Sequence, residues 1–277
     1  MDNIFIQIQT ALSFAFIQRA LIAGCLIALA CSALGFFLIL RRLALIGDGI
    51  AHVSFAAIAL GLMLNMMPLA LAVPIAVVAA LLIWELGEKS SIHSDTALGI
   101  VSTVSVAVGV ILASIGKGFN VDLFSYLFGS ILAVTRQEMA YAAVLCLCVI
   151  VLIAAFYHEL FAVSFDEEYA RASGIRSGRV NRILVVLTAV TVVLGIKLVG
   201  TMLVSSLIIL PAASSLQVAG SFRSGLTLGG ILSLLSVLIG ILFSYVLNLP
   251  AGGMIVCVNF FFFVLAFLLA RLRFSVR

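Results

Sequence analysis

Charged residues are scarce in this sequence. Asp, Glu, Lys and Arg together make up 9% of its 277 residues, whereas hydrophobic residues make up 65%. A soluble domain of this size does not have such a balance. Helices are the usual way for so apolar a chain to satisfy its backbone in lipid. The composition therefore predicts an all-α integral membrane protein, with a single transmembrane domain over residues 1–277.

Several catalytic signatures are also missing. No GxxxxGK[ST] phosphate loop occurs, since Gly116 and Lys117 lack the upstream glycine, so we do not expect the chain to hydrolyse ATP. No HExxH pattern occurs, and the five cysteines form no CxxC pair. Because the cysteines fall inside apolar runs, we interpret them as free packing thiols. These absences argue against an enzyme.

Apolar runs long enough to cross about 30 Å of hydrocarbon recur along the whole chain. They predict helices near residues 20–40, 43–66, 67–86, 96–115, 139–157, 183–199, 201–217, 225–247 and 251–270. Lys197 and Gly200 interrupt the run from 183 to 217, and Pro211 predicts a break in its second half. We therefore expect about nine transmembrane helices, with eight as the alternative if that run is one broken element.

The few cations are distributed unevenly. With nine spans and the C-terminus inside, eleven of the 15 Lys and Arg residues fall on the cytoplasmic side and four on the outer side. The positive-inside rule then places the N-terminus outside. The net charge of +4 therefore reflects orientation, and we expect no nucleic-acid partner.

One carboxylate and one imidazole stand inside an apolar run. Asp48 and His52 lie four residues apart in RRLALIGDGIAH, a spacing that puts both side chains on one face of a helix. An ionisable residue inside a span costs free energy and therefore indicates a functional site. The alternative is that Asp48 caps a helix or pairs with Arg41 or Arg42, and that His52 is merely hydrogen-bonded.

The one strongly polar stretch runs from residue 158 to residue 182. Asp166 predicts the start of a short helix with Glu167 and Glu168 in its first turn, and Gly174 predicts its end. A solvated connecting loop is the alternative. Because a plain loop is usually shorter and needs no capped helical turns, the pattern favours a docking element for a cytoplasmic partner.

Six stretches of the sequence match the motifs of one known family: LRRLALIGDGIAHVSF, DTALGIVSTVSVAVGV, FNVDLFSYLFGSILAVT, FDEEYARASGI, KLVGTMLVSSLIILPAASS and LPAGG. In these stretches the chain resembles the membrane permease subunits of bacterial ABC importers for zinc, manganese and iron. The stretches extend from about residue 40 to residue 253 in the order of the family, and two of them are most similar to its zinc-uptake branch.

The resemblance implies a type II ABC importer permease in the bacterial inner membrane. It implies a homodimer of this chain, surrounded by membrane lipid, with two cytoplasmic ABC ATPase subunits that bind the ATP. An extracytoplasmic metal-binding protein would deliver the ion, and no cofactor would be bound permanently. The resemblance also implies that a coupling helix seats in a groove of the ATPase, through Asp166, Glu167, Glu168, Tyr169, Arg171 and Gly174.

In this context, Asp48 and His52 are candidate metal ligands. A hard oxygen and a borderline nitrogen suit Zn²⁺ or Mn²⁺, and two copies of the pair would supply the four ligands that zinc prefers. The predicted function is import of a divalent transition-metal ion by alternating access. Zinc is the first candidate, and Mn²⁺ or Fe²⁺ is the alternative.

Residues near the outer ends of the helices form a further set of candidates. Asp122, Phe124 and Tyr126 are candidates for an outer gate or for contact with the binding protein. Lys197 either snorkels outward or pairs with Asp122 across the outer mouth.

Two other classes of protein remain as rivals. An intramembrane zinc metalloenzyme would need a third ligand that one chain does not show. A passive or ion-coupled carrier without an ATPase would not need the polar docking segment. Co-purification of a nucleotide-binding subunit would separate the carrier from the ABC permease.

Overall fold

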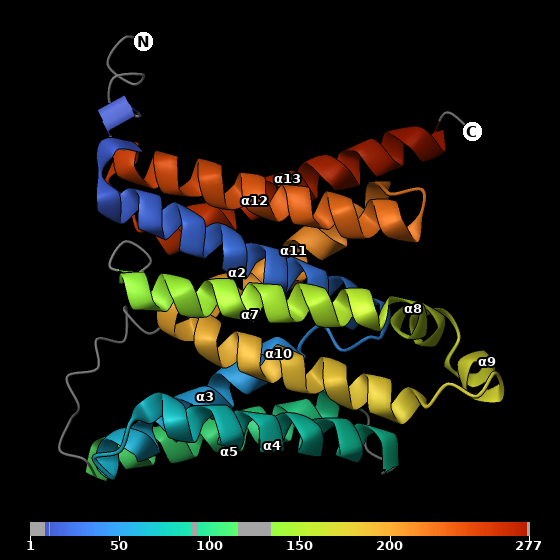
Figure 1. Cartoon of the computed structure of the whole chain (residues 1–277), viewed down its shortest axis with the longest axis horizontal. Coiled ribbons are helices and arrows are strands. Elements are labelled where there is room, and N and C mark those ends of the chain that lie inside the picture. The colour runs from blue at the N-terminus through green and yellow to red at the C-terminus, as the bar shows by residue number, and fades with distance from the viewer. Residues whose placement is uncertain (1–8, 11, 90–93, 116–133, 276–277) are drawn as a thin grey trace.

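The computed structural model describes residues 9–10, 12–89, 94–115 and 134–275, and every regular element in these ranges is a helix (Figure 1). The helices are α2 (Ala15–Leu40), α3 (Ile46–Met63), α4 (Pro68–Lys89), α5 (Ser94–Ile115), α7 (Arg136–Ala155), α8 (Tyr157–Phe165), α9 (Glu167–Ala172), α10 (Ser177–Val199), α11 (Thr201–Val218), α12 (Phe222–Leu247) and α13 (Ala251–Ser275). In this part of the chain, nine helices are long and apolar enough to cross a membrane, all except α8 and α9. The predicted membrane fold and the count of nine are confirmed.

Helix α2 lies at the centre of the bundle and packs against α7, α10, α11 and α12. On one side of this core, α4 and α5 pack against α3. On the other side, α13 packs against α11 and α12 (Figure 1). Few residues of α5 and α13 are buried within this chain. The apolar surfaces of these two helices must therefore be covered by lipid or by another protein.

Small residues allow the central helices to approach closely. A Cβ atom at Gly35 of α2 would overlap the carbonyl oxygen of Ile208 in α11. Between α12 and α13, a Cβ atom at Gly240 would lie 2.7 Å from the Cα atom of Ile255. Such contacts replace the hydrophobic driving force that helices lack within lipid.

Gly200 separates α10 from α11. Its backbone has φ 87° and ψ 163°, a conformation that is essentially restricted to glycine. Helix α11 then continues without a break through Pro211 to Val218. The predicted break at Pro211 is therefore wrong: a proline removes one backbone hydrogen bond, and a packed transmembrane helix can accommodate that loss.

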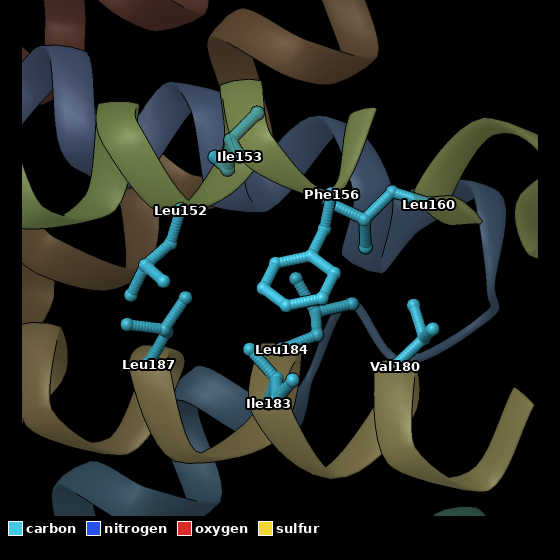
Figure 2. A pocket seen from close by; sticks show the side chains of 8 residues that line it. All are labelled: Leu152, Ile153, Phe156, Leu160, Val180, Ile183, Leu184 and Leu187. Atoms are coloured by element: carbon cyan, nitrogen blue, oxygen red, sulfur yellow. The ribbon is translucent and has the colours of Figure 1, made fainter. Parts of the chain in front are cut away.

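A small cavity lies where α7 and α8 meet α10 (Figure 2). Its volume is about 10 Å³, and it is lined by Leu152, Ile153, Phe156, Leu160, Val180, Ile183, Leu184 and Leu187. Because none of these side chains offers a polar partner for water, the cavity is a packing gap and not a binding site.

One end of the bundle collects most of the described charged contacts, and we call it the α9 end. It contains the ion pairs of Arg41, Arg171 and Arg182 with glutamates of α4 and α9. Helix α13 runs toward this end, whereas α2 starts at the opposite end (Figure 1). The first and last described spans, α2 and α13, therefore begin and end at opposite ends of the bundle, as the nine spans of the described residues require.

Candidate functional site

Asp48 and His52 lie on one exposed face of α3. Asp48 is in the first turn of the helix, and His52 follows one turn later. The Nε2 atom of His52 lies 3.6 Å from the Oδ2 atom of Asp48, and the side chains are 43% and 54% exposed, respectively. The predicted shared face is confirmed, and the pair is open to the surroundings of this chain.

Two glycines hold this part of α3 in place. A Cβ atom at Gly47 would lie 3.0 Å from the side chain of Ile208 in α11, and one at Gly49 would overlap Leu98 in α5. The backbone on either side of Asp48 is therefore clamped between α11 and α5. The carboxylate is left to point out of this contact, toward the exposed face.

Ser205 of α11 completes this polar face. Its hydroxyl donates a hydrogen bond to the Oδ1 atom of Asp48 over 3.3 Å. Arg41 is paired with Glu167, and within the described ranges neither Arg41 nor Arg42 forms an ion pair with Asp48. Asp48 also makes no capping hydrogen bond in α3, so the structural alternatives considered for this residue are absent here.

The face offers a carboxylate, an imidazole and a hydroxyl, which is too few to enclose a metal ion. Among the described residues, no three His, Cys, Asp or Glu side chains gather closely enough to hold one. A divalent ion that reaches this face would keep part of its water or take further ligands from outside the chain. The arrangement is therefore suited to transient contact or to half of a shared site.

Lys197 lies at the end of the bundle opposite α9. Its Nζ atom lies 3.1 Å from the Oε1 atom of Glu138 in the first turn of α7. The Glu138 carboxylate also accepts from the backbone N–H and the hydroxyl of Thr135, in a capping box. Lys197 therefore has a partner that the sequence did not suggest. Asp122, its predicted partner, lies outside the described residues, as do Phe124 and Tyr126.

The short helix α9 has the predicted caps. The Asp166 side chain accepts a hydrogen bond from the backbone N–H of Tyr169 over 2.9 Å. At the other end, Gly174 has φ 86°, and the N–H of Ile175 bonds back to the carbonyl of Ala170. Local sequence therefore determines both ends of α9.

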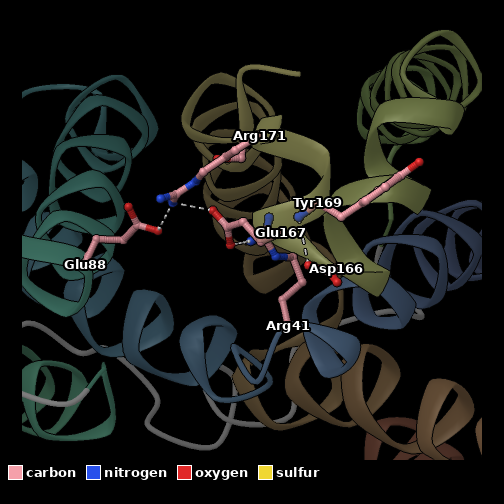
Figure 3. A network of polar contacts seen from close by, with 7 residues as sticks. Arg41, Glu88, Asp166, Glu167, Tyr169 and Arg171 are labelled. Atoms are coloured by element: carbon pink, nitrogen blue, oxygen red, sulfur yellow. Dashed lines mark hydrogen bonds and ion pairs between the residues drawn. The ribbon is translucent and has the colours of Figure 1, made fainter. Parts of the chain in front are cut away.

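An ion network fixes α9 to the rest of the bundle (Figure 3). Glu167 lies 2.6 Å from Arg41, at the end of α2, and 2.7 Å from Arg171. Arg171 in turn lies 3.6 Å from Glu88 of α4 and donates to the hydroxyl of Ser177 at the start of α10. The network thus joins α9 to three of the membrane-spanning helices.

Electrostatics keep Glu167 charged within this network. Burial raises the pKa of its carboxyl, but hydrogen bonds from Arg171 and Ser177 and the charges of Arg41 and Arg171 together outweigh that effect. The pKa of Glu167 therefore lies below the usual range of a glutamate. Burial also lowers the pKa of the Arg41 guanidinium, which has a side chain only 8% exposed.

The outward side of α8 and α9 presents a different set of residues. Phe165 is 78% exposed and Tyr169 is 70% exposed, and Glu168 is exposed beside them. In Figure 3 the Tyr169 side chain points away from the ion network. Of the predicted coupling residues, Glu167 and Arg171 thus anchor the segment, whereas Glu168 and Tyr169 are free to meet a partner.

Sequence reasoning missed several of these residues. Ser205, Glu138 and Glu88 contact their partners across helix interfaces, and no local pattern marks them. Phe165 could have been recognised, because it is an aromatic side chain directly before the N-cap residue of a short polar helix.

In the described part of the chain, nine spans, an exposed carboxylate and imidazole in one of them and a capped polar helix at one end define a multi-pass membrane protein of the permease class. The chain belongs to the ABC 3 transport family, whose sequence model matches residues 13–270. It is similar to the manganese transport system membrane protein MntC of Listeria monocytogenes, at 34% identity over 95% of this chain and 94% of that protein. It is also similar to the high-affinity zinc uptake system membrane protein ZnuB of Haemophilus influenzae, at 31% identity over 91% of this chain and 97% of that protein.

A solved structure has the same fold. The structure of PsaBC from Streptococcus pneumoniae in complex with Fab contains a chain with 33% identity, and the TM-score is 0.84 over 95% of each chain. The predicted family is therefore confirmed. The chain is the permease subunit of an ABC importer for a metal ion, and ATP hydrolysis belongs to a separate subunit.

Proposed function

We propose that two copies of this permease form a path for Zn²⁺ or another divalent transition-metal ion through the bacterial inner membrane. An extracytoplasmic binding protein delivers the ion, and two ATPase subunits drive alternating access from the cytoplasm. The relatives bear names of both manganese and zinc transport systems, so the identity of the ion is part of the proposal.

The exposed pair of Asp48 and His52 is the observation that carries the proposal. In a two-fold dimer with this face turned inward, two carboxylates and two imidazoles would converge on one ion. Four such ligands satisfy tetrahedral Zn²⁺, and two bidentate carboxylates with two imidazoles satisfy the higher coordination number of Mn²⁺. Ligands that are open to water within one copy also bind weakly enough for the ion to leave.

The distribution of charge supports an orientation with the α9 end in the cytoplasm. This end contains Arg41, Arg171 and Arg182, and the positive-inside rule assigns such an end to the cytoplasmic side. The N-terminus would then lie outside and the C-terminus inside. This orientation puts α9 where an ATPase can reach it.

The outward residues of α8 and α9 are proposed to dock on the ATPase. Phe165 and Tyr169 offer apolar area with a low cost in side-chain entropy, and Glu168 adds charge. The ion network behind them makes the segment stiff, because it joins α9 to α2, α4 and α10. A movement of the ATPase would therefore be transmitted to the membrane helices.

The test is metal uptake by the complete importer in proteoliposomes, with ATP inside and metal-loaded binding protein outside. We expect Asp48→Ala and His52→Ala to abolish uptake while the ATPase subunits remain bound. Asp95→Ala and His158→Ala are matched controls, since they remove an exposed carboxylate and an exposed imidazole elsewhere. Wild-type uptake in both test variants would remove the pair from the path. Competition among Zn²⁺, Mn²⁺ and Fe²⁺ in the same assay identifies the ion.

A further inference from the structure

An apolar groove lies on the surface of the bundle between α7 and α12, with α2 as its floor. Its volume is about 410 Å³, and its lining includes Leu29 of α2, Ile153 of α7 and Leu226 of α12. The hydroxyl of Thr227, also in the lining, is already bonded to the backbone carbonyl of Arg223. Apart from this hydroxyl and that of Tyr157, every side chain in the lining is apolar.

The dimensions of the groove match one leaflet of a membrane. Its lining extends from Ile150 in α7 to Tyr157, the first residue of α8, and from Leu226 to Leu234 along α12. At 1.5 Å per residue these stretches are about 10–12 Å long. One leaflet accounts for about 15 Å of hydrocarbon, so the groove accommodates most of one acyl chain and does not cross the bilayer midplane.

A cation stands at the end of the groove. The guanidinium of Arg223 lies 5.8 Å from the centre of the Tyr157 ring, and Tyr157 is part of the lining. Arg223 is exposed, and none of the acidic side chains in the described ranges forms an ion pair with it. The ring contact fixes the position of an otherwise flexible charge.

The groove faces away from the candidate metal face. Along α2, Leu29 and Ala33 line the groove, whereas Gly35 contacts α11 on the opposite side of the helix. Helix α11 carries Ser205, and none of the groove lining comes from α3 or α11. Two copies that meet through the metal face would therefore leave the groove open to lipid.

We infer that this groove binds an acidic phospholipid of the leaflet at the α9 end, with one acyl chain along α2 and the headgroup phosphate on Arg223. Guanidinium pairs with phosphate through two parallel hydrogen bonds, and the uncompensated charge favours a headgroup with net negative charge. In the proposed orientation this leaflet is the cytoplasmic one. The lipid would lie against α7 and α12, beside the start of α8.

Titration of the purified importer with phosphatidylglycerol or phosphatidylethanolamine, followed by native mass spectrometry, tests the inference. We expect wild type to bind one phosphatidylglycerol per copy of this chain. It should prefer phosphatidylglycerol to phosphatidylethanolamine by about fivefold, because the ammonium of phosphatidylethanolamine offsets the phosphate charge that Arg223 would meet. Arg223→Gln should abolish the preference. Its matched control is Arg179→Gln, which removes an exposed cation from the start of α10.

A second variant fills the groove. A Cβ atom at Gly230 would make ordinary contact with Leu29 at 3.5 Å, and Gly230 lines the groove, so Gly230→Leu would place a larger side chain there. The Gly230→Leu variant should bind neither phosphatidylglycerol nor phosphatidylethanolamine. Gly253→Leu is the control, because a Cβ atom there meets no neighbour within 4 Å.

Several results would overturn the inference. Equal binding of the two lipids by wild type would do so, as would unchanged binding of phosphatidylglycerol in both Arg223→Gln and Gly230→Leu. If Gly230→Leu instead separates the two copies of this chain, the groove is covered by the second copy and not by lipid. The assay contains no metal, so its result is independent of Asp48 and His52.

Discussion

The hydroxyl of Ser205 gives Asp48 a fixed direction. An aspartate side chain on an exposed helix face can rotate, and rotation would separate its carboxylate from the imidazole of His52. The hydrogen bond to Oδ1 leaves Oδ2 as the oxygen nearer His52. We therefore expect Ser205 to position Asp48 within the candidate metal face, which consists of Asp48, His52 and Ser205. It would act from α11, a helix that is far from Asp48 in the sequence.

Ser205→Ala should slow uptake of the metal ion by about two- to fivefold, the typical value of one exposed hydrogen bond. The variant keeps the Asp48 carboxylate but lacks the hydrogen bond that orients it, so the uptake rate should fall only in part. Uptake at saturating binding protein measures the effect. Ser205→Thr, which keeps the hydroxyl, should restore the wild-type rate, and a failure of this rescue would count against the positioning role. Ser206→Ala is the control, because that hydroxyl bonds to a carbonyl of its own helix.

At the scale of single elements, α9 shows what local sequence can specify. Its first turn and its end follow from Asp166 and Gly174, and the structure has both caps as predicted. What the helix rests on could not be predicted, since Arg41 and Glu167 are 126 residues apart. Pairing at that distance depends on how α2 and α8 cross, and that depends on packing contacts throughout the bundle.

The contact of α9 with α2 should weaken in acid. The pKa of Glu167 is below its usual value, so its stabilising effect is complete at neutral pH and is lost as pH falls through the lowered pKa, below about 4.3. Glu167→Gln should destabilise the importer near pH 7 by roughly 1–3 kcal/mol, because Arg41 loses its partner. The difference from wild type should begin to shrink below about pH 4.3 and disappear only once the pH is below the lowered pKa of Glu167.

Thermal unfolding of the importer in detergent, from pH 7 down to about pH 3, measures this difference. Glu168→Gln is the control, because Glu168 is exposed and takes no part in the ion pairs that join α9 to Arg41 and Arg171. A difference between Glu167→Gln and wild type that stays constant over this whole range would contradict the role given to the carboxylate.

Helix α11 shows the opposite case, in which a strong local signal was overridden. Pro211 predicted a break, but packing against α2 through Gly35 and against α12 and α13 keeps the helix continuous. The separation falls at Gly200, where the backbone conformation suits only glycine. In lipid, tertiary contacts and the cost of exposed backbone therefore decide where a helix ends.

At the scale of the whole molecule, the nine spans could be placed from apolar runs alone, because the thickness of the bilayer sets their length. The arrangement of the spans could not. Asp48 and Ser205 are 157 residues apart, and they meet because two glycines beside Asp48 clamp α3 against α11 and α5. The sequence predicts which side chains share a helix face, and packing decides what that face meets.

The exposed metal face leads to a prediction about pairs of chains. If two copies share one ion, a dimer of one wild-type copy and one copy with both Asp48→Ala and His52→Ala keeps only two of four ligands. Loss of a residue that only hydrogen-bonds to a metal ligand costs about 10–100-fold in metal affinity. Loss of two direct ligands should therefore reduce uptake to less than about a tenth of the wild-type rate. Two independent paths would instead leave half of the uptake.

Different affinity tags on the two copies, purified in sequence, isolate the mixed dimer for reconstitution with the ATPase. A mixed dimer of wild type and His158→Ala should transport at the wild-type rate, because His158 is exposed and lies beside Tyr157, away from the metal face. Half-maximal uptake by the first mixed dimer would mean that each copy conducts alone. In that case the open face of Asp48 and His52 would be a complete path within one chain, with water supplying the remaining ligands.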